Sequence, residues 1–417
     1  MKTPIRVYVE LAGATVRVGT LWARTRGTRQ SATFEYAREW LDHPNRFALE
    51  PALAVGPGPH HTPADIALFG SLMDSAPDRW GQVLMRRAER HVSAREGRAL
   101  QTLQPIDYLL RVNDMSRLGA LRFAVQEGGP FLAESTEATI PPIIALSRLL
   151  TAAEHIITED ETGDDLRLLL APGSSLGGAR PKASVFDVHG RLSIAKFPSP
   201  SDEWPTVLWE ALALSLARDA GIPVPAWQVE TVADKPVLLL QRFDREGNRR
   251  VPFLSAMSML GARDHETHSY LEIVDALRRW GAKPRDDMRA LFRRIVFNVL
   301  ISNTDDHLRN HGFLFATQAG WELAPAYDLN PTPADIKPRV LSTQIDLDDA
   351  TASLDLAFSV AEYFELKSED ARQIAREVGR SVANWRVQAA RIGIIPREID
   401  RMSSAFEHAD LAAATRI

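Results

Sequence analysis

The 417-residue sequence contains no cysteine. Disulfide bridges, thiolate metal ligands and cysteine nucleophiles are therefore excluded. No apolar run approaches the roughly 18 residues that a membrane-spanning helix needs. The first residues include Lys2, Arg6 and Glu10 and lack the apolar core of a signal peptide. We therefore expect a soluble, cytoplasmic protein with no membrane partner.

The sequence also lacks a strong excess of charge of either sign. Its net charge of −5 gives no general argument for nucleic-acid binding, although a local basic patch stays open. With 45% hydrophobic and 25% charged residues, the composition is that of an ordinary globular protein. The length favours two or three domains, each able to bury a core of its own.

The N-terminal third is rich in predicted strands. Apolar and polar residues alternate over residues 5–11 and again at Val16 and Val18, which predicts a hairpin around Gly13. Residues 75–91 predict a helix for which Ser75 is a candidate N-cap, and residues 118–125 resemble a strand. We therefore expect a β-rich N-terminal domain over residues 1–125.

Two further domains are expected at 126–248 and 249–417. In the first, two strands around residues 182–188 and 191–197 are joined at His189-Gly190, and a helix and an apolar strand follow. In the second, residues 286–301 have the periodicity of a buried amphipathic helix, and a short hairpin follows around Gly320. From about residue 355 to 412 the sequence alternates apolar and charged residues with a helical period.

The glycine-rich stretch from Ala171 to Phe197 resembles three known motifs. Gly173, Ser175 and Gly177 match a G-x-S-x-G nucleophile elbow, but that elbow needs a helix after the serine, where this sequence predicts a strand. Gly173 and Gly178 are spaced as in a Walker A loop, but Ala-Arg-Pro-Lys stands where Lys-Ser or Lys-Thr is required. A kinase-type glycine loop is the third interpretation.

The third interpretation also predicts the residues that follow. Lys196 lies on the second strand after the loop, where a kinase places the lysine that binds phosphates; an edge strand with a lysine reaching to water is the alternative. Asp305 and Asn310 have the D-x-x-x-x-N spacing of a kinase catalytic loop, and Asp328 follows 18 residues later. Without H-R-D and D-F-G, the chain is not an ordinary eukaryotic-type protein kinase.

The sequence resembles the HipA family of serine/threonine kinases, the toxins of bacterial toxin–antitoxin pairs, in their long form. The segments that carry the resemblance are SLGGARPK (175–182), IAKF (194–197), LLLQRFDR (238–245), SNTDDHLRN (302–310) and APAYDLNP (324–331). The resemblance implies an α+β, two-lobed atypical protein-kinase-like fold, with a β-rich N-terminal part and an all-helical C-terminal lobe. It places ATP between the two lobes.

The resemblance also assigns roles to individual residues. It makes Asp305 the catalytic base, places Asn310 and Asp328 on Mg²⁺, and identifies Ser175, or its neighbour Ser174, as the autophosphorylated residue. Glu210 either pairs with Lys196 or faces solvent, and Asp306 is expected only to help cap its loop. The ATP-binding residues that it implies are Gly177, Gly178, Ala179, Arg180, Pro181, Lys182, Lys196, Gln241, Arg242, Phe243, His307, Asn310, Tyr327 and Asp328.

The resemblance further implies a protein substrate, such as an aminoacyl-tRNA synthetase, and a HipB-like helix-turn-helix antitoxin. Operator DNA would be contacted mainly through that antitoxin, which agrees with the acidic balance of the chain. Two other functions stay open: a small-molecule or lipid kinase of related fold, and an ATP-binding co-repressor in an antitoxin–operator complex. The intact Lys196, Asp305, Asn310 and Asp328 favour an active kinase.

Overall fold

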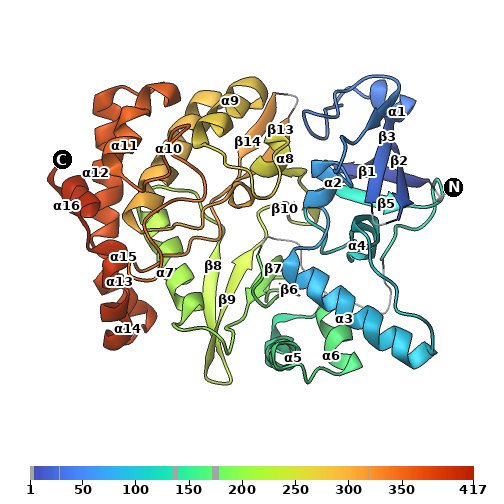
Figure 1. Cartoon of the computed structure of the whole chain (residues 1–417), viewed down its shortest axis with the longest axis horizontal. Helices are drawn as coiled ribbons and strands as arrows, with labels where there is room; N and C mark the ends of the chain where they lie inside the picture. Colours follow the sequence, from blue (N-terminus) through green and yellow to red (C-terminus); the bar gives the residue numbers. More distant parts are fainter. Residues whose placement is uncertain (1–3, 28, 135–139, 171–177, 318) are drawn as a thin grey trace. The chain divides into compact units, whose positions relative to one another are not determined.

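The computed structural model divides the chain into two compact units. Unit 1 contains residues 1–201 and 230–254, and unit 2 contains residues 202–229 and 255–417. The structure describes residues 4–27, 29–134, 140–170, 178–317 and 319–417. Both helices and sheets contribute to the fold, with most strands in the N-terminal part and most helices in the C-terminal part, which confirms the predicted α+β class (Figure 1). The division into three domains stays a prediction.

The N-terminal sheet has five antiparallel strands in the order β4-β3-β2-β1-β5. They are β1 (Ile5–Leu11), β2 (Ala14–Arg26), β3 (Arg29–Tyr36), β4 (Pro59–His61) and β5 (Leu121–Ala124). Val7 and Val9 are fully buried and the residues between them are not, so the alternation in the sequence does mark one face of this sheet. The hairpin and the strand near 118–125 are thereby confirmed.

In the described part of unit 1 the α-helices are α1 (Arg38–Leu41), α2 (Gly70–Asp74), α3 (Arg79–Glu96), α4 (Pro105–Arg111), α5 (Leu146–Thr158) and α6 (Gly163–Leu170). The expected cap of α3 was wrong. Ser75 ends α2, and Asp78 caps α3 by accepting the Gly81 N–H at 2.8 Å. Asp78 lies directly before the helix, whereas Ser75 lies too far from the first turn to reach its free N–H groups.

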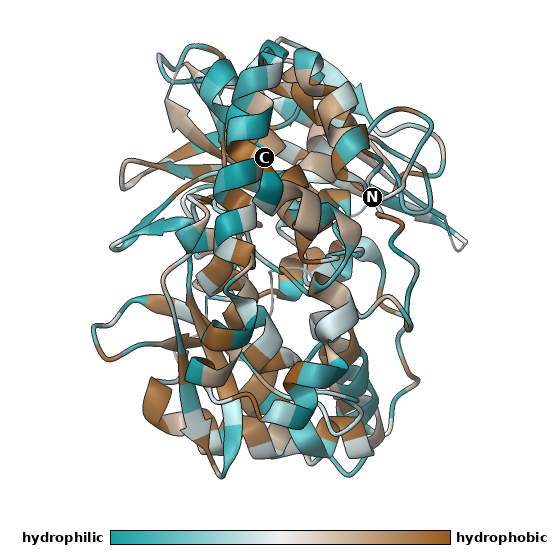
Figure 2. Ribbon diagram, turned by 90° about the vertical axis from the view of Figure 1, so that its left-hand side faces the viewer, coloured by the Kyte–Doolittle hydropathy of each residue, from teal (hydrophilic) through white to brown (hydrophobic). Residues whose placement is uncertain are grey.

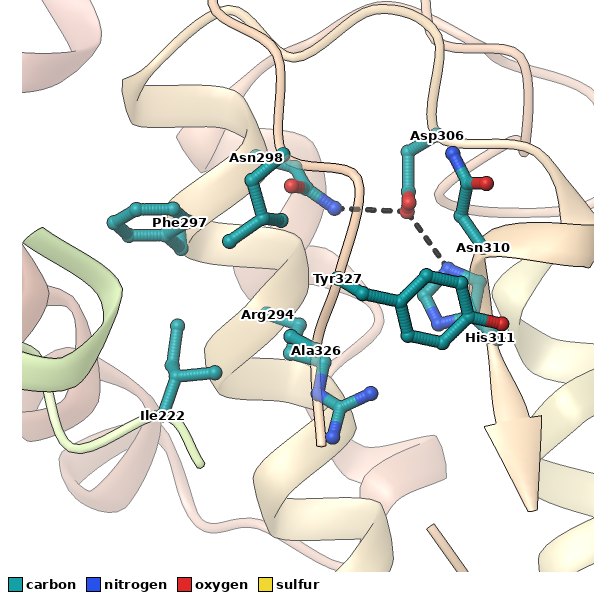
Figure 3. Close-up of a pocket in the computed structure, with 10 residues that line it drawn as sticks. Ile222, Arg294, Phe297, Asn298, Asp306, Asn310, His311, Ala326 and Tyr327 are labelled. Carbon is teal, nitrogen blue, oxygen red and sulfur yellow. Dashed lines mark hydrogen bonds and ion pairs between the residues drawn. The ribbon is translucent and has the colours of Figure 1, made fainter. Parts of the chain in front are cut away.

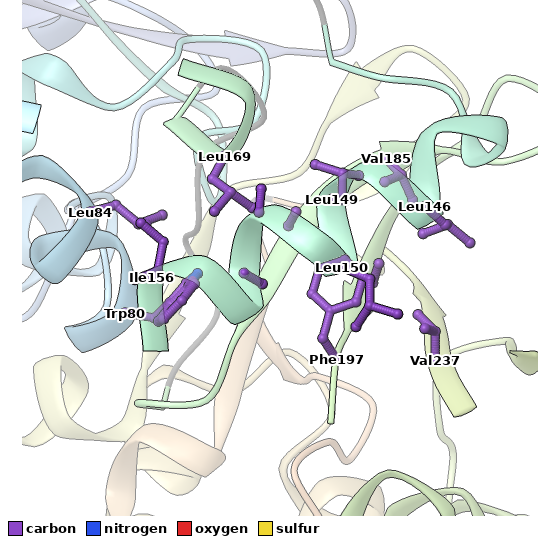
Figure 4. Packing of buried hydrophobic residues seen from close by; sticks show 14 of the residues in the cluster. Trp80, Leu84, Leu146, Leu149, Leu150, Ile156, Leu169, Val185, Phe197 and Val237 are labelled. Atoms are coloured by element: carbon purple, nitrogen blue, oxygen red, sulfur yellow. The ribbon is translucent and has the colours of Figure 1, made fainter. Parts of the chain in front are cut away.

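The second sheet carries the predicted lysine strand. Its order is β6-β7-β9-β8, with β6 (Lys182–Phe186), β7 (Leu192–Lys196), β8 (Trp227–Val232) and β9 (Lys235–Gln241). Apolar side chains from α3, α5 and α6 pack on this sheet; Figure 4 shows Trp80 of α3 and Leu149 of α5 in one cluster with Phe197, directly after β7, and Val237 of β9. The indole N–H of Trp80 donates to the carbonyl of Lys182 at 3.0 Å, which ties α3 to the first strand.

Unit 2 is built around α10 (Pro284–Leu300). Its predicted apolar positions are almost completely buried, but so are Val296 and Phe297, so α10 is enclosed on more than the one face expected. The helices of the unit combine polar and apolar residues (Figure 2). They are α7 (Thr206–Asp219), α8 (Ala256–Leu260), α9 (Tyr270–Trp280), α11 (Leu354–Ser359), α12 (Ser368–Val382), α13 (Trp385–Ile392), α14 (Pro396–Arg401), α15 (Ser403–Phe406) and α16 (Ala409–Arg416).

A short hairpin follows α10, as predicted. It consists of β13 (Gly312–Thr317) and β14 (Gly320–Leu323), and β12 (Phe253–Ser255) pairs beside β13. Gly320 has φ of +126°, and a Cβ there would lie 2.3 Å from the carbonyl oxygen of Trp280. Only glycine satisfies both constraints. Two short strands, β10 (Arg245–Glu246) and β11 (Arg249–Arg250), form a separate ribbon in unit 1.

No helix in the described ranges combines the length and the apolar character needed to cross a membrane.

A buried carboxyl group should make the stability of unit 1 depend on pH. Glu50 is 5% exposed and accepts the Ser71 N–H, and burial raises its pKa from 4.5 to about 7. Because the pKa of Glu50 is raised on folding, its contribution to stability is fully present below pH 4.5 and is lost as the pH rises to about 7. Thermal unfolding of Glu50→Gln should therefore occur several degrees above that of the unaltered protein at pH 7.5, with a much smaller difference near pH 4.5. Glu39→Gln, at an exposed position, is the control; equal pH dependence in all three proteins would contradict the prediction.

Candidate active site

Residues 301–311 form a tight loop between α10 and β13. The loop begins where α10 ends at Leu300, and Ser302 has a left-handed φ of +52° that turns the chain away from the helix. The His307 N–H donates to the Asp305 carbonyl at 2.9 Å, and the Asn310 N–H donates to that of His307 at 2.8 Å. A 3₁₀ turn over Leu308–Asn310 then leads into β13. This 301–311 loop therefore has its own backbone support.

The two predicted kinase residues of this loop differ sharply in exposure. The side chain of Asp305 is 67% exposed, and its carboxylate lies 3.9 Å from the ammonium of Lys337. Asn310 is 4% exposed and donates its Nδ2–H to the Asp305 carbonyl at 3.2 Å. Its Oδ1 is buried and has no hydrogen-bond partner. An exposed carboxylate suits a base that meets a substrate, and an unsatisfied amide oxygen is the kind of group that a Mg²⁺ ion takes as a ligand.

Tyr327 and Asp328 lie after the hairpin, in the same unit. The Tyr327 hydroxyl donates to the Arg309 carbonyl at 2.7 Å and so fastens this segment to the 301–311 loop. Asp328 adopts a left-handed φ of +59°, and Asn330 donates to its Oδ1 at 3.3 Å. Asp305, His307, Asn310, Tyr327 and Asp328 thus belong to one unit and to two segments that contact each other.

A small cavity lies behind the loop (Figure 3). Asn310, Tyr327, Arg294, Asp306 and His311 are among the residues that line it. Asp306 is buried, with three hydrogen-bonding side chains on its carboxylate, so its expected role as a minor cap understated its contacts. Burial would raise the pKa of Asp306, but His311 beside it and the bonds from its neighbours lower it. Asp306 therefore stays ionised inside the protein.

Lys196 ends β7, which lies between β6 and β9 in the sheet. The alternative of an edge strand was therefore wrong. The Lys196 side chain is half-buried, and Leu192 and Ile194 on the same face are buried. A half-buried ammonium on an interior strand fits a role in binding an anion. Glu210, on α7, is 5% exposed, so it does not face solvent as its alternative required; its pairing with Lys196 stays a prediction.

Lys182 is placed differently from what the resemblance implies. Its Cα is opposite that of Lys196 in the β6–β7 pairing, but its ammonium lies 2.6 Å from the Asp78 carboxylate. Both side chains are at most 4% exposed. The side chain of Lys182 thus joins β6 to the start of α3, and its predicted role at the nucleotide stays a prediction. Sequence reasoning missed Asp78, although an Asp directly before a predicted helix is a recognisable cap signal.

The predicted hinge is Gln241 to Phe243. Gln241 ends β9, and both Gln241 and Phe243 are half-buried. The Arg242 N–H donates to the Leu192 carbonyl at 3.0 Å, and its guanidinium forms a fully buried pair with Asp244 at 2.6 Å. These two Arg242 groups are already engaged within the protein, and its predicted contact with adenine stays a prediction. Burial would raise the pKa of Asp244, but the guanidiniums of Arg242 and Arg245 lower it to about 2.

The glycine loop is described only in part. Gly178, Ala179 and Arg180 are exposed, Pro181 is buried, and Gly178 has φ of +102°, which glycine adopts without strain. Gly177 and the serines Ser174 and Ser175 lie outside the described residues, so their predicted roles stay predictions.

Comparisons with known proteins agree with one another. The family model of the HipA-like C-terminal domain matches residues 174–385, just over half of the chain. A Sinorhizobium fredii protein named "Putative kinase Y4mE" is 24% identical over 366 residues, covering 78% of this chain and 80% of its own length. A Haemophilus influenzae protein named "Putative kinase" is 24% identical over 234 residues, covering 50% of this chain and 68% of its own length.

The fold is similar to that of HipA from Shewanella oneidensis MR-1, solved in a complex with HipB and its operator DNA. The TM-score is 0.66 at 16% identity, and the likeness covers 99% of this chain and 97% of that one. At that identity the likeness concerns the fold. The family match over more than half of the chain shows that it belongs to the family of proteins with a HipA-like C-terminal domain.

Proposed function

We propose that the chain is a protein kinase that transfers the γ-phosphate of ATP to a serine or threonine hydroxyl of another protein. The observation that carries this proposal is the pairing, within one loop, of an exposed Asp305 with a buried Asn310 whose Oδ1 is unsatisfied. Asp328 lies on the segment fastened to this loop by Tyr327. The relatives described as kinases support it.

In the proposed reaction, Asp305 orients the substrate hydroxyl and accepts its proton. The hydroxyl oxygen forms a bond to the γ-phosphorus while the bond from that phosphorus to the β–γ bridging oxygen breaks, and ADP leaves. Lys196 would hold the α- and β-phosphates. Asn310 and Asp328 would hold Mg²⁺, which when bound offsets negative charge on the phosphates. Their oxygen ligands, one of them unsatisfied in the structure, fit that ion.

The backbone around Gln241 and Phe243 is proposed to contact adenine. His307 and Tyr327 would lie near the nucleotide, and Gly177 to Pro181 would form the flexible cover over its phosphates. An aminoacyl-tRNA synthetase is the substrate class that the family suggests. The alternative of a small-molecule or lipid kinase is tested by incubating the protein with labelled ATP and a cell lysate: labelled protein bands support the proposal, and label confined to small molecules or lipids supports the alternative.

A HipB-like helix-turn-helix antitoxin is the proposed partner, and operator DNA would be bound mainly through it. The support is the fold likeness to a HipA that was solved with HipB and operator DNA. An ATP-binding co-repressor without kinase activity is the competing function. It predicts binding of ATP and of the antitoxin, with no transfer of phosphate by the unaltered chain.

Replacing the base should separate catalysis from binding. Asp305→Gln keeps a polar side chain of similar reach but removes the proton acceptor, so the rate of phosphotransfer should fall at least about 100-fold while ATP affinity changes little. Transfer is measured with labelled ATP and affinity by calorimetry. Asp348→Asn, an exposed carboxylate in the same unit, is the control. Retained activity in Asp305→Gln would mean that the base is misassigned.

Removing the unsatisfied amide should weaken the use of Mg²⁺. Asn310→Ala deletes Oδ1, so the Mg²⁺ concentration that gives half-maximal phosphotransfer should rise about tenfold or more. Asn384→Ala removes an exposed asparagine of unit 2 and should leave the Mg²⁺ dependence unchanged. A Mg²⁺ titration that is identical in Asn310→Ala and the unaltered protein would contradict the assignment.

Autophosphorylation at Ser175 should inactivate the enzyme. A phosphate adds roughly −1.5 to −2 charges in the loop that covers the phosphates of ATP. ATP affinity of the phosphorylated protein should therefore be about tenfold or more below that of Ser175→Ala. Equal affinities would contradict the mechanism, and mass spectrometry of Ser174→Ala and Ser175→Ala shows which serine carries the phosphate.

A further inference from the structure

Asp306 is a buried carboxylate directly after the proposed base Asp305 in the sequence. Its side chain is 3% exposed, whereas that of its neighbour Asp305 is 67% exposed. The Tyr270 hydroxyl donates to Oδ2 of Asp306 at 2.5 Å, and Nδ2 of Asn298 donates to it at 2.8 Å. Nε2 of His311 lies 2.7 Å from the same oxygen. Figure 3 shows the contacts from Asn298 and His311 converging on it.

These partners come from separate elements of unit 2. Tyr270 is the first residue of α9, Asn298 lies in the last turns of α10, and His311 immediately precedes β13. The Thr343 hydroxyl also donates to the backbone carbonyl of Asp306, at 2.7 Å. One buried residue therefore fixes the 301–311 loop to two helices and to the segment of Thr343, and joins the middle of the loop to its end at His311. With the Asp306 side chain held inward, the adjacent Asp305 side chain is directed to solvent.

A second set of contacts leads from Asp306 to Asp328. Oδ1 of Asn298 accepts from Nδ2 of Asn303 at 3.0 Å, and Oδ1 of Asn303 accepts the Asn330 N–H at 3.3 Å. Nδ2 of Asn330 donates to Oδ1 of Asp328 at 3.3 Å. Asn298 and Asn303 are at most 1% exposed, so water does not compete for the bond between them. The two segments of the candidate site share one continuous hydrogen-bonded chain.

We propose that Asp306 is a positioning residue that holds the base Asp305 and the metal-binding Asp328 in their working arrangement. This inference rests on the proposed kinase function. Asp306 itself touches neither residue's carboxylate; it acts by orienting the loop and, through three asparagines, the Asp328 side chain. Displacing a reacting group by about 1 Å costs on the order of 100-fold in rate, so loss of such support should appear in catalysis.

The first test compares variants that differ in how much of the support they remove. Asp306→Asn keeps the size and removes the charge, and Tyr270→Phe removes one donor. We expect the kcat of Asp306→Asn to fall about 100-fold and that of Tyr270→Phe to fall about fivefold, with the KM for ATP changed less than about threefold. Ser381→Ala is the control: it removes a buried bond to the Leu216 carbonyl, at 2.7 Å, elsewhere in unit 2. It should lower the unfolding temperature and leave kcat unchanged.

The second test separates positioning from stability. If Asp306 only stabilised the fold, Asp306→Asn would lower the unfolding temperature while the remaining folded protein kept its kcat, and Tyr270→Phe would be fully active. Either result overturns the proposal. Should Asp306→Asn fail to fold, the kcat of Tyr270→Phe decides. If the unaltered chain transfers no phosphate, the kinase function and this inference both fail, which is a different result from loss in the variants alone.

The third test addresses the chain of asparagines. Asp306→Asn and Asn330→Ala should each raise the Mg²⁺ concentration for half-maximal phosphotransfer. Because Asp306 acts on Asp328 through Asn330, the double variant should show a shift smaller than the product of the two single shifts. Shifts that simply multiply would mean that the two residues act independently and would overturn the connection to Asp328.

Discussion

A carboxylate that is buried away from water needs hydrogen-bond donors around it. Unit 2 contains such a carboxylate next to the candidate site. Asp306 accepts bonds from Tyr270 and Asn298, with His311 beside the same oxygen. Leaving such a group unpaired would be costly, so the three partners and the loop that carries Asp306 must adopt their positions together. This constraint determines where α9, α10 and β13 meet. It also explains why adjacent aspartates have opposite exposure.

The same physical solution recurs in unit 1, at the segment predicted to be the hinge. Asp244 is fully buried, receives Arg242 at 2.6 Å, and accepts the Gly119 N–H at 2.7 Å. Arg242 also donates to the Ser116 carbonyl at 2.9 Å. The end of β9 is thereby attached to the loop before β5, far away in sequence. In both units, a buried ionised aspartate joins segments that the chain order separates, next to residues that we assign to the nucleotide.

The sequence predicted most elements because local periodicity determined them. Strands β1, β2 and β5 of the N-terminal sheet, the lysine strand β7, helix α10 and the hairpin around Gly320 were recognisable from the sequence, whereas β3 and β4 were not predicted. The side-chain pairs that hold the site in place could not be recognised from the sequence. Nothing local distinguishes Asp306, which is buried, from Asp305, which is exposed, since the difference comes from Tyr270 and Asn298 on distant elements. Likewise, Lys182 pairs with Asp78, about a hundred residues earlier.

A second buried charge lines the same cavity as Asp306. Arg294, on α10, is 4% exposed and donates to the Ala324 carbonyl, on the segment that leads to Tyr327 and Asp328. Burial lowers its pKa to about 10, while the negative charge of Asp306 favours its ionised form. Each of these two charges therefore makes the other less costly to bury. Asp306 holds the 301–311 loop and Arg294 holds the segment that leads to Asp328, so two buried charges that line one cavity support the two parts of the candidate site.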